Sequence, residues 1–371
     1  MEKKTPLFHI VKRDTMPLWK AWAVRLASIL LALVVCAVFI NSVTGLNPLS
    51  VYASMFDGAF GTGRRIWNTV NDAMILLCIA LAITPAFKMR FWNIGAEGQI
   101  LVGGAATAAV MRYCGDSLPT PALFALMVVV SLLCGLVWGL VPAWFKARWN
   151  TNETLFTLMM NYIAIQLVSF LSIKWEAVKG SGTIGVINQS TKAGWIDTGF
   201  LSGIFGRFNY SINTTLILII TLLIFVYLNY TKHGYEIAVV GESENTARYA
   251  GISVRRVILR TMALSGALCG LVGFLLVSGS NHTISVNTAG GDGFTAIVVS
   301  WLAKFNPFAM IAISFLLTFL TRGAGQIASD FGLNESASDI LTGIILFFIL
   351  GSEFFINYRV LRSSRKEKEA E

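Results

Sequence analysis

The sequence predicts an all-α polytopic membrane protein with about ten transmembrane helices. Hydrophobic residues make up 55% of its 371 residues and charged residues only 13%, which is about half the charged share of a typical soluble domain. The apolar residues are gathered in runs of about 20, the length with which a helix crosses a bilayer. So few charges are not enough to cover a surface that faces water on all sides.

Ten apolar segments are expected to form the helices in the membrane. In order they are residues 22–44, 66–87, 94–113, 120–145, 152–174, 212–230, 257–279, 294–304, 307–322 and 338–357. Segment 294–304 is short for a full crossing. The first segment follows a basic leader, but it is too long for the apolar part of a signal peptide, so we expect it to be retained. A transmembrane domain over 22–357 then lies between an N-terminal segment, 1–21, and a basic tail, 358–371.

The distribution of lysine and arginine predicts the orientation of these helices. An even number of crossings puts both termini on one side, and a cytoplasmic placement puts 21 of the 29 Lys and Arg residues inside. This excess is what the positive-inside rule expects. It also explains the net charge of +9 without nucleic acid as a partner. We therefore expect a multi-pass protein of the bacterial cell (inner) membrane, with its largest outside loop at 175–211 and its largest cytoplasmic loop at 231–256.

Two stretches of similar length suggest an inverted repeat in the core of the fold. Residues 66–174 and 257–357 each hold four apolar segments, and each carries a Gly-rich break before one of them, at Trp92–Gln99 and at Gly290–Thr295. With the predicted topology the two breaks enter the membrane from opposite sides, a pattern that points to a substrate pathway. The alternative is that the glycines permit close packing of helices in lipid. Both interpretations remain open.

Polar residues in or beside the apolar segments are the candidate pathway residues. Asn93, Glu97 and Gln99 lie in the first break, and a carboxylate at membrane depth is costly unless it faces protein or water. The alternative is a polar loop at the cytoplasmic surface. Asn161 lies inside the segment 152–174, where its amide either lines a pathway or ties two helices together.

The cytoplasmic loop contains the pattern of a short helix. Ser243 is a good N-cap, residues 244–250 follow it, and Gly251 suits the position just after a helix end. Glu242 and Glu244 near the start suit the helix dipole. A short helix held between two membrane segments is suited to contact a partner protein, and the alternative is a solvated linker.

Other chemistries are not indicated by the sequence. The histidines are His9, His233 and His282, which are far apart, and none of the five cysteines has metal or disulfide spacing. The dipeptide Gly-Lys does not occur, so a P-loop for ATP is excluded. We expect no metal, no cofactor and no catalytic residue in this chain.

Four stretches, in order, resemble the permeases of ABC importers for nucleosides and simple sugars, within the branched-chain amino acid and ribose type permease superfamily. They are Phe91–Gln99 (FWNIGAEGQ), Asn152–Tyr162, Gly234–Ile252, and Gly293–Ile297 followed by Asn306 and Pro307. The resemblance runs from about residue 65 to 357, and the first stretch is closer to the nucleoside branch. One departure is Asn68–Asp72, where the family has an apolar stretch with Pro and Gly. Asn71 and Asp72 there suggest a polar lining or an interfacial position and leave the substrate open.

The resemblance implies a permease subunit that forms the translocation pathway for a nucleoside or simple sugar. Its implied partners are a separate ABC ATPase, a second permease (a paralogue or a second copy), and an extracellular substrate-binding lipoprotein or periplasmic protein. The expected pathway residues are Asn71, Asp72, Asn93, Glu97, Gln99, Asn161, Phe294 and Thr295. The residues expected to couple to the ATPase are Glu242, Asn245, Ala247, Arg248, Tyr249 and Gly251.

Two other function classes are alternatives to the importer. An ion-coupled secondary transporter of a small polar solute needs an intramembrane ion site, for which paired acids or an acid–histidine relay in mid-segment are typical. The sequence shows neither. An intramembrane enzyme is the third class, and neither large loop is big enough for a catalytic domain.

Overall fold

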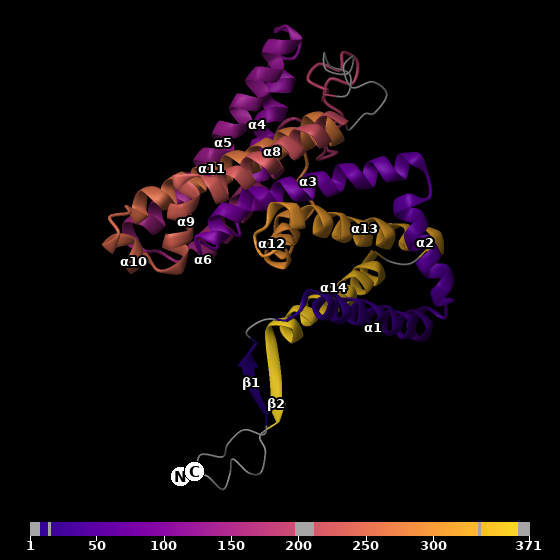
Figure 1. The fold of residues 1–371 in the computed structure, drawn as a ribbon. Coiled ribbons are helices and arrows are strands. Elements are labelled where there is room, and N and C mark those ends of the chain that lie inside the picture. Colours follow the sequence, from indigo (N-terminus) through magenta and orange to yellow (C-terminus); the bar gives the residue numbers. More distant parts are fainter. Residues whose placement is uncertain (1–7, 14–15, 197–210, 333–334, 363–371) are drawn as a thin grey trace. The chain divides into compact units, whose positions relative to one another are not determined.

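The computed structural model describes residues 8–13, 16–196, 211–332 and 335–362 (Figure 1). Its contacts divide the chain into two compact units. One unit, here called the core unit, is Ile66–Thr318. The other, here called the terminal unit, combines Met1–Arg65 with Phe319–Glu371. The sequence indicated one transmembrane domain and gave no sign of this division, because it depends on contacts between the two ends of the chain.

The terminal unit is held together by pairing of segments that are far apart in the sequence. Its elements include β1 (Phe8–Lys12), α1 (Leu18–Thr44), α2 (Pro48–Phe60), α14 (Glu335–Asn357) and β2 (Tyr358–Arg362). The strands β1 and β2 pair antiparallel over five residues each, drawn as the indigo and yellow arrows in Figure 1. Helix α1 packs on α14, where Arg25 forms an ion pair with Glu353. The two strands and α2 were not predicted.

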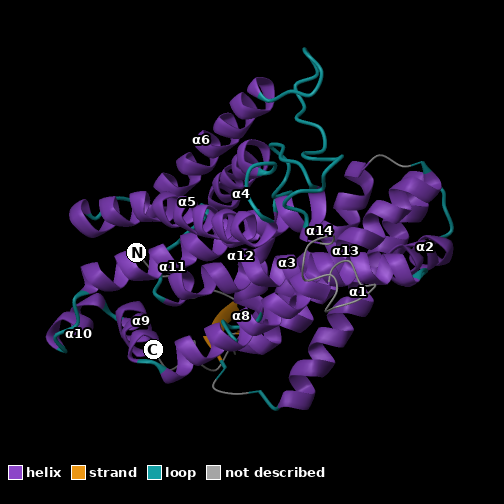
Figure 2. Ribbon diagram, turned by 90° about the horizontal axis from the view of Figure 1, so that it is seen from above, coloured by secondary structure: helices purple, strands orange, loops and turns teal. Residues whose placement is uncertain are grey.

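The core unit is built almost entirely of helices (Figure 2). In chain order they are α3 (Gly63–Lys88), α4 (Ala96–Cys114), α5 (Thr120–Trp149), α6 (Glu153–Lys174), α8 (Ser211–Tyr230), α9 (Lys232–Glu242), α10 (Glu244–Tyr249), α11 (Val254–Phe274), the π-helix η2 (Leu275–Asn281), α12 (Asp292–Leu302) and α13 (Pro307–Phe331). Helices α3 and α13 each cross the border between the two units. Helix α3 is buried on every side from Ala73 to Phe87, as expected of a helix at the centre of a bundle.

Eight helices of the described chain are long and apolar enough to cross a membrane, which confirms an all-α polytopic membrane protein. All ten predicted segments coincide with helices, but α4 and α12 are not among the eight. Helix α12 has 11 residues, which gives a length of about 16 Å against the roughly 30 Å of a hydrocarbon core. Ten full crossings and an inverted repeat are therefore not confirmed. The two helices that fall short are the two that follow the Gly-rich breaks.

Helix α11 packs against α5 and α4 through glycines that bring the backbones into direct contact. A Cβ placed on Gly270 would lie 2.2 Å from the carbonyl oxygen of Ser131 in α5, and one on Gly273 would lie 2.3 Å from the carbonyl oxygen of Ile100 in α4. Glycines four residues apart line both sides of the α5–α11 contact, at 135 and 139 and at 266 and 270. This small-residue packing is typical of membrane helices. We call it the glycine seam.

Candidate functional site

The two Gly-rich breaks meet at the carboxylate of Glu97, which lies in the first turn of α4 and is only 8% exposed. Its Oε1 accepts a hydrogen bond from the backbone N–H of Gly291 at 2.9 Å, and its Oε2 accepts one from the N–H of Gly293 at 3.0 Å. Both donors lie at the start of α12. The first Gly-rich break therefore supplies, through Glu97, the cap of α12, the helix that follows the second Gly-rich break.

This contact satisfies groups that α12 cannot satisfy by itself. The first N–H groups of a helix have no partner within the helix, and the N-cap residue Gly291 has no side chain to offer. A carboxylate also suits the positive end of the helix dipole. The approach requires glycine at 293, because a Cβ there would lie 2.7 Å from Oε2 of Glu97.

Asn93 and Gln99 form a second, fully buried contact at the start of α4. Gln99 Nε2 donates to Asn93 Oδ1 at 3.3 Å, and Asn93 Nδ2 donates to Ser265 Oγ of α11 at 3.2 Å. Both side chains are at most 1% exposed. The structure therefore brings these two predicted pathway residues together, in a position where they brace the first break against α11.

Asn161 connects α6 to the same break. Its Oδ1 accepts from the N–H of Gly98 at 2.8 Å, and its Nδ2 donates to the carbonyl of Ile94 at 2.8 Å. The side chain is 3% exposed. The sequence left two roles open for Asn161, lining a pathway or tying two helices together. These hydrogen bonds are those expected of a residue that ties helices together.

Asn71 and Asp72 lie on α3 in a cluster with polar residues of two other elements. Asn71 Nδ2 donates to Ser280 Oγ of η2 at 3.2 Å, and Asn213 Nδ2 of α8 donates to Asn71 Oδ1 at 3.3 Å. Asp72 is partly exposed and interacts electrostatically with Asp292 at the start of α12. Asn213 and Ser280 were not among the predicted site residues. Ser280 lies in the π-helix η2, an irregularity that is frequent at functional sites.

Phe294 and Thr295 occupy the first turns of α12, next to the contact with Glu97. Phe294 is 46% exposed, and Thr295 is partly exposed with its Oγ1 donating to the carbonyl of Gly291 at 3.4 Å. Asp292 precedes them and was not among the predicted pathway residues. We call the cluster of Asn71, Asp72, Glu97 and Asp292 the polar junction.

The predicted surface helix is present as α10, Glu244–Tyr249, one residue shorter at its C-terminal end than the predicted 244–250. Ser243 is the N-cap of α10, and its Oγ accepts from the N–H of Thr246 at 3.3 Å. Gly251 follows the C-cap residue Ala250 with φ +76°, a left-handed conformation that favours glycine. The capping signals were therefore sufficient to locate this helix from the sequence.

Most of the residues expected to couple to a partner have exposed side chains. Tyr249 is 94% exposed, Glu242 and Asn245 are exposed, and Arg248 pairs with Glu244 at 3.3 Å on the surface of the helix. Ala247 differs, because its side chain is fully buried. Ala247 and Gly251 therefore contribute to the conformation of α10, and the neighbouring side chains form its exposed surface.

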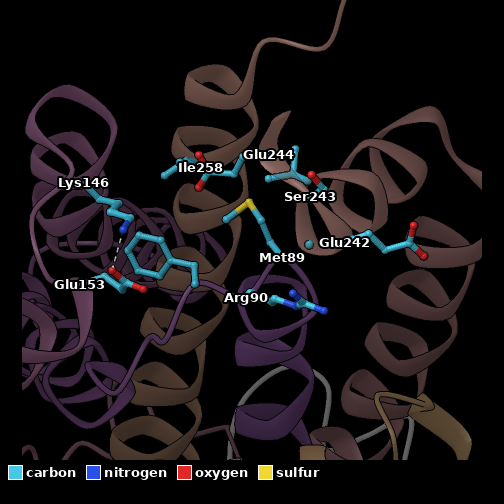
Figure 3. A pocket seen from close by; sticks show the side chains of 11 residues that line it. Met89, Arg90, Lys146, Glu153, Glu242, Ser243, Glu244 and Ile258 are labelled. Atoms are coloured by element: carbon cyan, nitrogen blue, oxygen red, sulfur yellow. Dashed lines mark ion pairs between the residues drawn. The ribbon is translucent and has the colours of Figure 1, made fainter. Parts of the chain in front are cut away.

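A pocket of about 250 Å³ lies where the α9–α10 turn meets the ends of α3 and α5 (Figure 3). Lys146 and Glu153, joined by an ion pair of 3.0 Å, lie on one side of it, and Glu242 lies on the other. The turn after α3 contributes Met89, Arg90 and Phe91 to the lining. The surface helix and the segment that leads into the first break thus share one pocket.

Helix α9 is also tied to α11 by an ion pair. Arg260 Nη2 lies 3.0 Å from Glu236 Oε2. Burial raises the pKa of Glu236, but the hydrogen bond from Arg260 and the charges of Arg260, Lys232 and His233 outweigh it and hold that pKa below its ordinary value. The carboxylate is therefore charged at neutral pH.

Within the described ranges no group of three or more His, Cys, Asp or Glu side chains is arranged to hold a metal ion. The arrangement consists of a polar junction inside an apolar bundle and a capped helix on the surface.

Comparison with known proteins identifies a family and several relatives to which this chain is similar. The family model described as the permease component of the branched-chain amino acid transport system matches residues 65–350. A guanosine ABC transporter permease of Bacillus subtilis is 30% identical over 332 residues, which cover 89% of this chain and 93% of that protein. A glucose ABC transporter permease of Haloferax volcanii is 28% identical over 360 residues, 94% of this chain and 92% of that protein. A nucleoside ABC transporter permease of Lactococcus lactis is 28% identical over 315 residues, covering 82% of this chain and 84% of that protein.

These relatives are permease components, and they favour the importer over the ion-coupled secondary transporter and the enzyme. ATP hydrolysis accordingly belongs to a separate subunit, which agrees with the lack of a P-loop in the sequence. With a family match over most of its length and relatives similar along nearly the whole of both chains, this protein belongs to the family of ABC transporter permease components.

Proposed function

We propose that this chain forms the translocation pathway of an ABC importer for a nucleoside or a monosaccharide, with the polar junction as part of the pathway and α10 as the contact with the ATPase. The observation that carries the proposal is α10 itself. It is a capped surface helix on which Arg248 pairs with Glu244 of the same helix and Tyr249 is 94% exposed.

The position of α10 suits the transmission of motion. It follows α9 directly and precedes α11 by a few residues, and α9 ends against the last carbonyl of α3 at Gly241. A push on α10 therefore acts on α3 and α11 through short connections. Glu242, Asn245, Arg248 and Tyr249 are the side chains placed to receive it.

The polar junction suits a neutral polar solute. It offers carboxyl and amide groups inside a bundle whose buried side chains are mostly apolar, and Phe294 on α12 adds an exposed aromatic side chain. Sugars and nucleosides combine hydroxyl groups with apolar ring faces, and pockets for such ligands pair a few polar groups with aromatic surface. The names of the relatives, guanosine and glucose permeases, support the same class.

The proposal includes the partners and orientation expected from the sequence. The ATPase docks on α10 from the cytoplasm, where both termini also lie. A second permease, either a paralogue or a second copy, completes the pathway, and an extracellular binding protein delivers the solute.

The test is to purify the chain from its native membrane, identify the proteins that accompany it and measure ATP hydrolysis by the complex. We expect an ATPase to copurify. Tyr249→Ala and Arg248→Glu should each reduce the amount of bound ATPase, because they remove an exposed anchor or reverse a charge at the contact.

Tyr162→Ala is the matched control. Tyr162 is 60% exposed in the single chain but lies on α6, so its removal should leave the ATPase bound. Purification of the chain without any ATPase, together with uptake that an uncoupler abolishes, would contradict the importer and favour ion-coupled transport.

A further inference from the structure

A second hollow lies beside α10, with a volume of about 600 Å³. It is lined by the last turn of α5, by α10 and by the link from α10 to the start of α11, and it shares Lys146 and Glu244 with the pocket in Figure 3. We call it the basic hollow, because four of its described lining residues are cations and one is an anion: Lys146, Arg148, Arg248, Arg255 and Glu244.

Two of these cations have no acidic partner in the described chain. Lys146 and Arg248 are each paired with a glutamate. Among the residues that the structure describes, no ion pair includes Arg148 or Arg255, and both side chains are exposed. The hollow therefore carries positive charge that the described chain leaves uncompensated.

Local helix electrostatics explain only some of these cations. Lys146 and Arg148 lie in the last turn of α5, where a cation suits the negative end of the helix dipole. Arg255 is the second residue of α11 and lies at the positive end of that dipole, where a cation is disfavoured. The positive-inside rule accounts for cations on this side of the membrane but not for their position around one hollow. The arrangement therefore points to an anionic group from outside the chain.

The surroundings of the hollow favour a protein as the source of this group. Apart from Tyr249, the exposed side chains of α10 are polar or charged, so this surface suits water and protein rather than lipid tails. Trp149 lines the hollow and is 56% exposed, and its ring contacts those of Trp144 and Phe145 at 4.9 and 5.2 Å between centroids. Arginine together with tryptophan and tyrosine is the composition typical of the residues that carry most of the binding energy at protein interfaces.

We propose that the basic hollow receives an acidic segment of the ATPase, with one carboxylate at Arg148 and another at Arg255. Guanidinium groups match carboxylates through paired, charge-assisted hydrogen bonds. This deepens the proposed function and rests on it, because it gives the chemistry by which the ATPase recognises this chain. It also adds the end of α5 to a contact that the sequence indicated only at α10 and its ends.

The first experiment measures binding of the ATPase that copurifies with the wild-type chain. This ATPase is purified separately and titrated onto the chain, with its companion permease, in nanodiscs of a neutral phospholipid. Arg148→Glu and Arg255→Glu should each weaken binding by roughly tenfold or more, because each sets a like charge against a carboxylate of the partner. The loss should shrink at high salt, which screens the charges.

The matched control is Arg256→Glu. Arg256 follows Arg255 in α11 and is also exposed, so this substitution changes the net charge by the same amount. Arg256 is not among the residues that line the hollow, and we expect its variant to bind the ATPase almost as the wild type does. Thermal unfolding of all three variants shows whether each is folded as the wild type is.

A second experiment identifies the acidic residues of the partner. Arg148→Lys and Arg255→Lys keep the positive charge and introduce a primary amine, which a water-soluble carbodiimide joins to a carboxylate in direct contact with it. Each variant should form a covalent bond between the new lysine and an Asp or Glu of the ATPase, which mass spectrometry locates. Arg256→Lys should form no such bond.

The results separate this proposal from the proposed function. If Arg148→Glu and Arg255→Glu bind the ATPase as tightly as the wild type does, the hollow is not part of the contact, although the proposed function stands. An equal loss in Arg256→Glu would mean that only the overall charge matters, and the proposal would be wrong.

A lipid headgroup is the other possible occupant. If the glutamate variants keep the ATPase but lose phosphatidylglycerol that copurifies with the wild type, the hollow holds a lipid and the proposal is wrong. If no ATPase accompanies the wild-type chain, the proposed function itself fails and this proposal falls with it.

Discussion

Gly241, in the last turn of α9, lies so close to Lys88 at the end of α3 that a Cβ on residue 241 would be 2.2 Å from the carbonyl oxygen of Lys88. The contact joins the segment that carries the surface helix to the segment that leads into the first Gly-rich break. Only a residue without a side chain fits there.

The first prediction concerns this contact. Gly241→Ala should force α9 away from α3 and lower the free energy of unfolding by about 1–3 kcal/mol, the usual effect of overpacking. Thermal unfolding of the purified protein measures it. Gly325→Ala is the control, because no atom lies within 4 Å of the added Cβ and the change in a helix interior should be neutral or stabilising. Equal melting temperatures for the Gly241 variant and the wild type would contradict the close contact.

The second prediction concerns the cap that Glu97 provides. Glu97→Gln replaces one carboxylate oxygen with an NH₂ group, which cannot accept the N–H of Gly291 or Gly293. We expect a loss of about 1–3 kcal/mol, the cost of leaving a buried donor without a partner. Chemical denaturation in detergent measures it, with Glu176→Gln as control, since that side chain is partly exposed and accepts a single weak hydrogen bond at 3.3 Å. A loss as small as that of the control would show that the cap contributes nothing.

The third prediction concerns the tie between α6 and the first break. Asn161→Ala removes the partners of the Gly98 N–H and the Ile94 carbonyl at once, and both contacts are at 2.8 Å. We expect a loss of about 2–3 kcal/mol for two orphaned buried groups. Asn229→Ala on α8 is the control, because Asn229 is exposed and bonds only within its own helix. Limited proteolysis should show faster cleavage near the break in the Asn161 variant alone.

The fourth prediction concerns pH. The pKa of Glu236 is lowered in the folded protein, because the hydrogen bond and charge of Arg260 outweigh the opposite effect of burial. A carboxylate with a lowered pKa contributes stability that is fully present above its unfolded pKa of about 4.3 and is lost as the pH falls through its folded pKa. Glu236→Gln should therefore melt at a lower temperature than the wild type at neutral pH.

The difference between the two proteins should then shrink as the pH falls below about 4. A difference that is constant from neutral to acidic pH would mean that the ion pair with Arg260 contributes nothing. Glu242→Gln is the control in the same helix, at its other end, where the side chain is exposed.

The elements that could be predicted from the sequence are those whose signals are local. The ends of α10 follow from Ser243 and Gly251, which lie within a few residues of the helix. The long apolar runs likewise located the long helices, because about 20 apolar residues in a row have few other structures available.

The contacts of the polar junction could not be predicted, because their partners are distant in the sequence. Glu97 and the glycine that it caps at 291 are 194 residues apart, and Asn71 is 209 residues from Ser280. A single sequence shows that Glu97 needs a partner but does not show which one. The strands β1 and β2 were not predicted for the same reason. Both are short, and each forms a strand through its hydrogen bonds to the other, which is distant in the sequence.

The glycine seam has a mechanical consequence. Along the contact of α11 with α5 and α4, glycines bring the helix backbones into direct contact. Packed helices change position by small sliding motions, and sliding is easiest where no side chain must leave a hole in its neighbour. Helix α11 begins just after α10 and continues into η2, which carries Ser280. A displacement of α10 along the axis of α11 would therefore be transmitted to the hydrogen bond between Ser280 and Asn71. Helix α11 would in this way connect the surface helix mechanically to the polar junction.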